Sequence, residues 1–171
     1  MLNLDPSFED GSDWLLLDNA EIVSWADHDL PNYADEGPDD DVGVAFKGWL
    51  AGAGSFEQEI ALDGADGLEF TIAADVHREP GFNPTDFGLY FQFFDTDGFP
   101  LGMPTRINLY SLQNGSDATN GAEWHRVSAT STAPSGTMSV LIVGYFEGTS
   151  DVGGLQAARF DNVELTCAAG E

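Results

Sequence analysis

The sequence predicts an all-β fold, a two-sheet antiparallel β-sandwich of the jelly-roll type with about ten strands. Its 171 residues include 20 glycines and 8 prolines, which interrupt the chain about every ten residues, as is typical of sandwiches and barrels. The segments between these breaks alternate in polarity or are rich in β-branched and aromatic residues. No segment keeps an apolar stripe of helical spacing for more than one or two turns.

Turn-forming pairs such as Asp63-Gly64 and Asp97-Gly98 separate the expected strands. In chain order, these strands are 14–17, 21–25, 42–50, 55–62, 68–77, 87–94, 106–112, 123–130, 138–146 and 158–165. A chain of this length forms one domain, expected over residues 1–171 with its core in 3–165 and a short tail in 166–171. The acidic stretch 35–41 is predicted to be a loop inside that domain.

Period-two alternation assigns the faces of these strands. In 87–94 one face is Phe87, Leu89, Phe91 and Phe93, which indicates a core face. The second face of 87–94, 106–112 and 138–146 mixes aromatic, amide, charged and apolar side chains. Its members are Tyr90, Gln92, Phe94, Arg106, Asn108, Tyr110, Leu112, Leu141, Val143, Tyr145 and Glu147. Such a face fits a ligand with apolar surfaces and hydroxyl edges, and its apolar members also allow cover by a loop or a second subunit.

The charge is strongly negative: 30 Asp and Glu against 5 Lys and Arg give a net charge of −25. Such a surface repels phosphate backbones and anionic lipids, which argues against nucleic-acid and membrane-surface partners. It suits a protein kept soluble in salty, halophilic or marine surroundings, or one that binds cations. No apolar run is long enough to predict a membrane span. No basic and then apolar leader follows Met1, so we expect a cytosolic chain or a mature secreted one.

Catalytic and zinc-binding motifs are absent from the sequence. Cys167 is the single cysteine, so no intrachain disulfide is expected, and an ordinary tail residue is favoured over an interchain link. The three histidines have no metal-ligand spacing. Since neither a nucleophile elbow nor a phosphate loop occurs, an enzyme is not expected.

An ordered set of motifs runs from residue 3 to residue 165. They are NLDPSFE at 3–9 with Trp14, GVAFK at 43–47, SFEQEI at 55–60, FFDTDG at 93–98, EWHRV at 123–127, APSGT at 133–137 and FDNVEL at 160–165. Together they resemble the calcium-containing carbohydrate-binding modules of glycoside hydrolases, in the galactose-binding-like jelly-roll superfamily. The resemblance implies an extracellular, non-catalytic module that binds a polysaccharide or oligosaccharide and is often appended to a glycan-degrading catalytic domain. It places Trp14 and Trp124 in the core.

The resemblance also implies a structural calcium ion held by Glu9 and Asp161, with backbone carbonyls completing the site. Calcium takes six to eight oxygen ligands in flexible geometry, and here it would join the first and last strands. The alternative is that both are ordinary carboxylates without a metal. Residues 95–98 do not begin an EF-hand loop, because the twelfth position from Asp95 is Arg106 and not an acid; a hairpin turn is predicted there.

The mixed second face is the predicted sugar platform. Pyranose rings have apolar faces that stack on aromatic rings, and their hydroxyls pair with planar amides, carboxylates and guanidinium groups. The predicted ligand-binding residues are Tyr90, Gln92, Asn108, Tyr110, Arg106 and Tyr145, flanked by Trp49 and Trp25. The negative charge favours a neutral polysaccharide such as a β-glucan, xylan or mannan.

A second hypothesis assigns the same fold to a self-assembling extracellular surface or filament subunit with calcium-dependent contacts. Neighbouring subunits would then cover the apolar members of the mixed face. The two hypotheses differ in whether that face is an open groove in the single chain.

Overall fold

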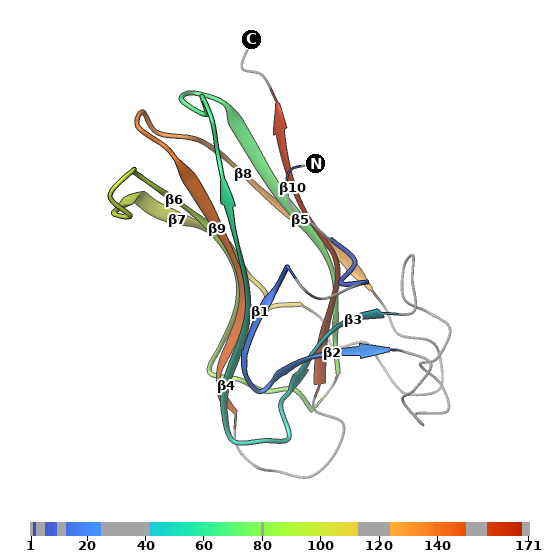
Figure 1. Cartoon of the computed structure of the whole chain (residues 1–171). Helices are drawn as coiled ribbons and strands as arrows, with labels where there is room; N and C mark the ends of the chain where they lie inside the picture. The colour runs from blue at the N-terminus through green and yellow to red at the C-terminus, as the bar shows by residue number, and fades with distance from the viewer. Residues whose placement is uncertain are drawn as a thin grey trace.

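The computed structural model describes residues 2, 6–9, 13–24, 42–79, 81–112, 124–149 and 157–168. Within these residues the chain forms ten strands in two antiparallel five-stranded sheets that lie face to face (Figure 1). The predicted β-sandwich is therefore confirmed. No helix of the described part is long and apolar enough to cross a membrane.

Sheet A has the strand order β1-β4-β9-β6-β7, and sheet B has the order β2-β3-β10-β5-β8. The strands of sheet A are β1 (Leu15–Asp18), β4 (Gly52–Ala61), β6 (Asp86–Phe94), β7 (Pro100–Asn108) and β9 (Ser139–Thr149). Those of sheet B are β2 (Ala20–Ser24), β3 (Val42–Lys47), β5 (Glu69–Arg78), β8 (His125–Thr132) and β10 (Ala157–Ala168). Most strands lie within a few residues of their predicted positions.

The prediction for the seventh strand was wrong in position. We expected 106–112, whereas β7 begins at Pro100 and ends at Asn108, and a turn with a hydrogen bond from Leu112 N to Leu109 O (3.1 Å) follows it. β7 contains two prolines, which lack the N–H that a sheet ladder needs. They are tolerated because, within the described residues, β7 is an edge strand that pairs only with β6, with a register shift between Phe91 and Phe93.

The core between the sheets is built mainly from phenylalanines. Phe46 lies at its centre, with ring centroids 5.0 Å from Phe146, 5.3 Å from Phe160 and 5.8 Å from Phe56. The predicted core face of β6 is confirmed, since its four apolar side chains are at most 4% exposed. Gly144 makes room for these rings, because a Cβ there would lie 2.1 Å from the Cζ of Phe56.

The turn between β6 and β7 is the predicted hairpin. Asp95 Oδ1 accepts the backbone N–H groups of Asp97 and Phe99, both at 2.9 Å. Gly98 has φ of +79°, a value that favours glycine. These bonds and the glycine together form the tight connection of the hairpin.

An N-terminal segment runs beside β10. Leu2 N donates to Leu165 O (2.7 Å), and Val163 N donates to Pro6 O (2.9 Å). β10 carries a bulge between Asp161 and Glu164, where Asn162 has φ of +47°. The strand continues to Ala168, so Cys167 lies within it opposite Phe70 and carries a free thiol.

Candidate functional site

The register of sheet A gathers the mixed face into rows that cross the strands. One row is Leu17, Ser55, Tyr145, Gly88 and Asn108, and the next is Leu15, Glu57, Val143, Tyr90 and Arg106. Residues opposite one another on paired strands share a face of the sheet. Four predicted ligand-binding residues (Tyr90, Arg106, Asn108 and Tyr145) therefore lie together on the outer face of sheet A.

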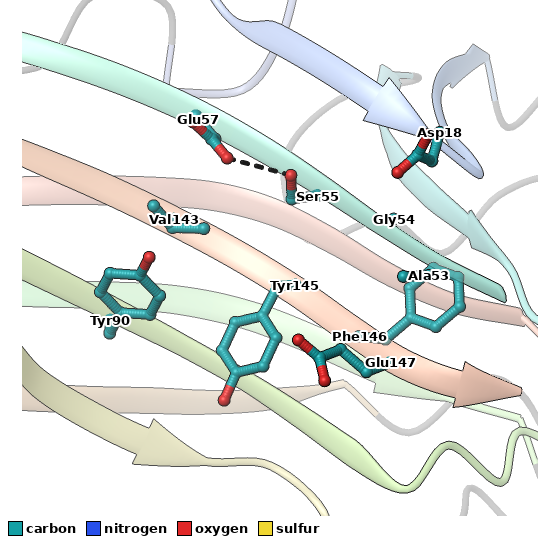
Figure 2. A pocket seen from close by; sticks show the side chains of 10 residues that line it. All are labelled: Asp18, Ala53, Gly54, Ser55, Glu57, Tyr90, Val143, Tyr145, Phe146 and Glu147. Carbon is teal, nitrogen blue, oxygen red and sulfur yellow. Dashed lines mark hydrogen bonds between the residues drawn. The ribbon is translucent and has the colours of Figure 1, made fainter.

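An open groove of about 280 Å³ lies on this face, and we call it the outer groove (Figure 2). β1, β4, β6 and β9 all contribute to it. Its lining residues are Asp18, Ala53, Gly54, Ser55, Glu57, Tyr90, Val143, Tyr145, Phe146 and Glu147. Figure 2 shows the Tyr145 side chain extending from β9 toward the neighbouring strand β6. Among the described residues, nothing closes this groove over the mixed face.

Gly88 determines where the Tyr145 ring lies. A Cβ at Gly88 would come within 2.9 Å of Tyr145 Oη and 3.0 Å of its Cε1. Since real Cβ atoms essentially never approach so closely, any larger residue would force the ring away. The ring centroid of Tyr145 lies 5.8 Å from that of Tyr90 in an edge-to-face arrangement. The two tyrosines form an aromatic surface beside the outer groove.

Arg106 and Asp86 hold the other side of Tyr145. Arg106 forms an ion pair with Asp86, and its Cζ lies 5.3 Å from the Tyr145 ring centroid. Tyr145 Oη donates to Asp86 Oδ2 at 3.3 Å. Burial raises the pKa of Tyr145 to about 12; Arg106 opposes this rise, whereas Asp86 and Glu147 add to it. The phenol therefore stays protonated at neutral pH and remains a hydrogen-bond donor.

Three carboxylates, those of Asp18, Glu57 and Glu147, line the outer groove. The Ser55 hydroxyl donates to Glu57 Oε1 at 3.1 Å. Among the described residues, no cationic side chain forms an ion pair with any of the three. Burial and the charge of Glu57 raise the pKa of Tyr90. The groove is therefore anionic and rich in hydrogen-bond acceptors.

The other predicted ligand-binding residues lie elsewhere. Gln92 is buried, and its Nε2 donates to Phe93 O (2.9 Å) and Leu101 O (3.1 Å), so it supports the irregular pairing of β6 with β7. Tyr110 packs on Arg78, whose Cζ lies 5.3 Å from the ring centroid. Trp49, in the β3–β4 connection, does not line the outer groove. Trp25 falls outside the described residues.

Sequence reasoning did not single out Asp18, Ser55, Glu57, Asp86 or Glu147. Alternation placed Glu147 on the mixed face, but nothing in the pattern distinguished it from the other acids. Ser55 and Glu57 join the site only because β4 pairs with β9, a register that the sequence does not specify. Asp86 directly precedes the predicted start of its strand, so the periodicity did not include it.

The apolar members of the mixed face are partly covered within the chain. Val143 is 3% exposed, and Leu112 packs against the core cluster. These two residues therefore need no second subunit to bury them. Leu15 and Leu17 of β1 remain exposed on the same face.

The residues expected to hold calcium have suitable chemistry. Asp161 is fully buried, and its Oδ1 accepts the N–H of Asn162 at 2.7 Å. Glu9 follows the buried Phe8, which has φ of +62°, in the segment tied to β10 through Pro6. Carboxylates are hard oxygen ligands of the kind calcium takes. No group of three or more His, Cys, Asp or Glu suited to a metal occurs in the described residues, so carbonyls would have to complete the shell.

The β-sandwich fold of this chain is shared with solved carbohydrate-binding modules. A family 61 module, TmCBM61, solved with β-1,4-galactotriose, matches with a TM-score of 0.56 and 18% identity over 97% of this chain and 98% of that one. The Clostridium thermocellum xylanase 10B fragment CBM22-1–GH10, solved with xylohexaose, matches with a TM-score of 0.58 and 16% identity. That match covers 93% of this chain and 27% of the xylanase chain.

A third match lies in a larger phage protein. The enzymatically active domain of tailspike protein 4 from bacteriophage CBA120 has a TM-score of 0.63 and 15% identity. It covers 95% of this chain, which spans 20% of that protein. At these identities the matches show the shared fold. No protein-family model matches the sequence, and comparison with curated proteins gives no match.

Proposed function

We propose that the chain is a non-catalytic carbohydrate-binding module that binds a neutral polysaccharide in the outer groove. The observation that carries this proposal is the pair Tyr90 and Tyr145 beside Arg106 at an open groove of sheet A. The shared fold with modules solved in complex with galactotriose and xylohexaose supports it.

The groove offers the two kinds of contact that a sugar needs. The tyrosine rings supply apolar surface for the C–H faces of pyranose rings. Glu57, Glu147 and Asp18 accept hydrogen bonds from hydroxyls, while Arg106 and the Tyr90 hydroxyl can donate them. Because the acids are unpaired among the described residues, uronate-bearing and sulfated glycans would be repelled.

The proposal includes a structural calcium ion at Glu9 and Asp161 and an extracellular location. A catalytic domain for the same glycan, joined to the module, would work at a raised effective concentration of substrate. Such a partner is consistent with the xylanase match, in which a module and a catalytic domain share one chain.

Affinity electrophoresis tests the proposal in gels containing soluble β-1,4-xylan, β-1,4-mannan, β-1,4-galactan, mixed-linkage β-glucan or polygalacturonate. We expect retardation by at least one neutral polymer and none by polygalacturonate. Tyr145→Ala should weaken binding about tenfold, since loss of an aromatic contact costs about 1.4 kcal/mol. Gly88→Ala should weaken it similarly by displacing the same ring.

Phe99→Ala is the matched control, because Phe99 is an aromatic residue that is 66% exposed on the β6–β7 hairpin. It should bind like the wild type. The proposal is wrong if no neutral polymer retards the wild type, or if Tyr145→Ala is retarded equally. Calcium-dependent oligomers without any retardation would favour the surface-subunit hypothesis instead.

A further inference from the structure

Asp86 joins side chains from three neighbouring strands. It is the first residue of β6, and its two carboxylate oxygens engage different partners. Oδ1 pairs with Arg106 of β7, and Oδ2 accepts the hydroxyl of Tyr145 from β9. Of these three residues, Tyr145 lines the outer groove, whereas Asp86 and Arg106 do not. Asp86 thus contacts both Tyr145 and Arg106, the residues proposed to bind sugar.

The backbone explains why Arg106 can reach Asp86. Arg106 stands opposite Tyr90, and Asp86 lies four residues before Tyr90 on the same strand. Between them on that face is Gly88, which has no side chain to obstruct the path. The Tyr145 ring lies over the Gly88 position, and the Cζ of the guanidinium that reaches Asp86 lies 5.3 Å from the centroid of that ring.

The position of the Arg106 guanidinium depends on the negative charge of Asp86. Glu147 stands directly opposite Asp86 on β9, so two carboxylates face each other across the strand pair. Arg106 pairs with Asp86, whereas Glu147 has no ion pair among the described residues. An arginine side chain has many rotamers, and the ion pair to Asp86 selects one of them. Among the described residues, Arg106 Nε and Nη1 donate to no protein acceptor, which leaves these donors for a ligand.

We propose that Asp86 is a positioning residue that fixes Arg106 and Tyr145 in one arrangement before the polysaccharide binds. This inference rests on the proposed function of the outer groove. Asp86 acts through Arg106 and Tyr145 and touches no sugar itself. A preorganised pair binds more tightly because less freedom is lost when the ligand arrives.

The test uses the full chain in gels containing β-1,4-xylan, β-1,4-mannan, β-1,4-galactan or mixed-linkage β-glucan. Asp86→Ala should weaken binding to the retarding polymer by about fivefold to tenfold, and Asp86→Asn, which keeps an acceptor for Tyr145, by less. Because Asp86 acts mainly through Arg106, Asp86→Ala should add little to the loss caused by Arg106→Ala. Glu21→Ala is the matched control: Glu21 has the same 37% side-chain exposure as Asp86 and pairs with Lys47 on sheet B.

A second readout does not depend on any sugar. Asp86 raises the pKa of the Tyr145 phenol, so Asp86→Asn should lower the ultraviolet titration midpoint that Tyr145→Phe removes. Glu21→Ala should leave that midpoint unchanged.

The outcomes separate this inference from the proposed function. Unchanged binding by Asp86→Ala, or a loss that adds fully to that of Arg106→Ala, overturns the positioning role while the groove remains the binding site. An unchanged phenol midpoint in Asp86→Asn also overturns it. Absence of retardation of the wild type in every gel overturns both.

Discussion

His77 is a buried histidine on the outer side of sheet B. Arg159 Nη1 lies 3.1 Å from its Nδ1, and Arg159 Nη2 donates to Glu79 Oε1 at 2.7 Å. Burial first, and then the positive charges of Arg159 and His125, together lower the pKa of His77 to about 3. Since the arginine N–H needs an acceptor, Nδ1 is unprotonated and the imidazole is neutral.

This histidine should make the fold sensitive to acid. The unfolded chain takes up a proton near pH 6.5, whereas the folded chain does so only near pH 3. As the pH falls through this window, the free energy of unfolding should drop by up to about 1.4 kcal/mol per pH unit. Above pH 6.5 the contribution is complete. The comparison is thermal unfolding of wild type and His77→Gln across this range.

His77→Gln keeps an acceptor for Arg159 and should show a flatter pH dependence than the wild type. Protonation of surface carboxylates affects both proteins alike, so the difference isolates the histidine. Parallel curves, or an imidazole NMR titration of His77 with a midpoint near 6.5, would contradict the prediction.

Single residues of the site were predictable only in part. Tyr90, Arg106, Asn108 and Tyr145 share one face as predicted, because alternation along each strand determines the face of each residue. Tyr110 was assigned to that face by the same rule, but the strand ends at Asn108, so the alternation no longer applies there. The ion pair of Asp86 with Arg106 depends on the register between β6 and β7. The alternation of residues within one strand does not predict that register.

The segment before β1 is attached to β10 by backbone hydrogen bonds. The segment bonds to β10 through Pro6 and Leu2, and the β10 bulge places Asn162 and Val163 beside it. Arg126 of β8 stabilises this bulge. It donates hydrogen bonds to Asn162 O at 3.0 Å and to Glu164 Oε2 at 2.5 Å. A calcium ion at Glu9 and Asp161 would add a further link to the same junction.

Calcium should therefore raise the melting temperature of the wild type above its value in chelator. An ion at about 100 times its dissociation constant adds about 2.7 kcal/mol to the free energy of unfolding, which amounts to several degrees. Glu9→Gln and Asp161→Asn should lose this response, as measured by calorimetry with calcium and with chelator.

Glu164→Gln is the control for this prediction, because Glu164 is an acid of the same strand that already pairs with Arg126. It should keep the full response to calcium. Equal melting temperatures of the wild type in calcium and in chelator would remove the cation from the proposal.

The strands themselves were largely predictable, since turn residues and alternation are local signals. β7 was the exception, because Pro100 and Pro104 are tolerated only at an edge, and the sequence does not state which strand is at the edge. Which strands pair with one another depends on the whole sheet in the same way, so the local sequence does not predict it.

The whole molecule carries 25 more negative than positive charges. Such self-repulsion favours solubility and destabilises the compact state. Most of the few lysines and arginines form ion pairs, such as Lys47 with Glu21 and Arg126 with Asp75. Most acids therefore have no cationic partner and depend on screening by salt.

Added salt should raise the melting temperature. Between about 0.1 M and about 1 M NaCl the screening length falls from about 10 Å to about 3 Å, which weakens repulsion among the acids. We expect an increase of several degrees in thermal unfolding scans with chelator present, so that calcium plays no part. A flat or falling melting temperature over this range would show that repulsion does not limit stability.

The order of strands in sheet B has a consequence for how the protein forms. β10, the last of the described strands in chain order, is the middle strand of that sheet, between β3 and β5. During synthesis, neither half of sheet B can join the other until this strand has left the ribosome. Until then β3 and β5 each present an open edge, which invites pairing with other chains. Sheet B is thus expected to fold late and in one cooperative step, after β10 has been synthesised. Before that step the exposed strand edges make the chain prone to aggregation.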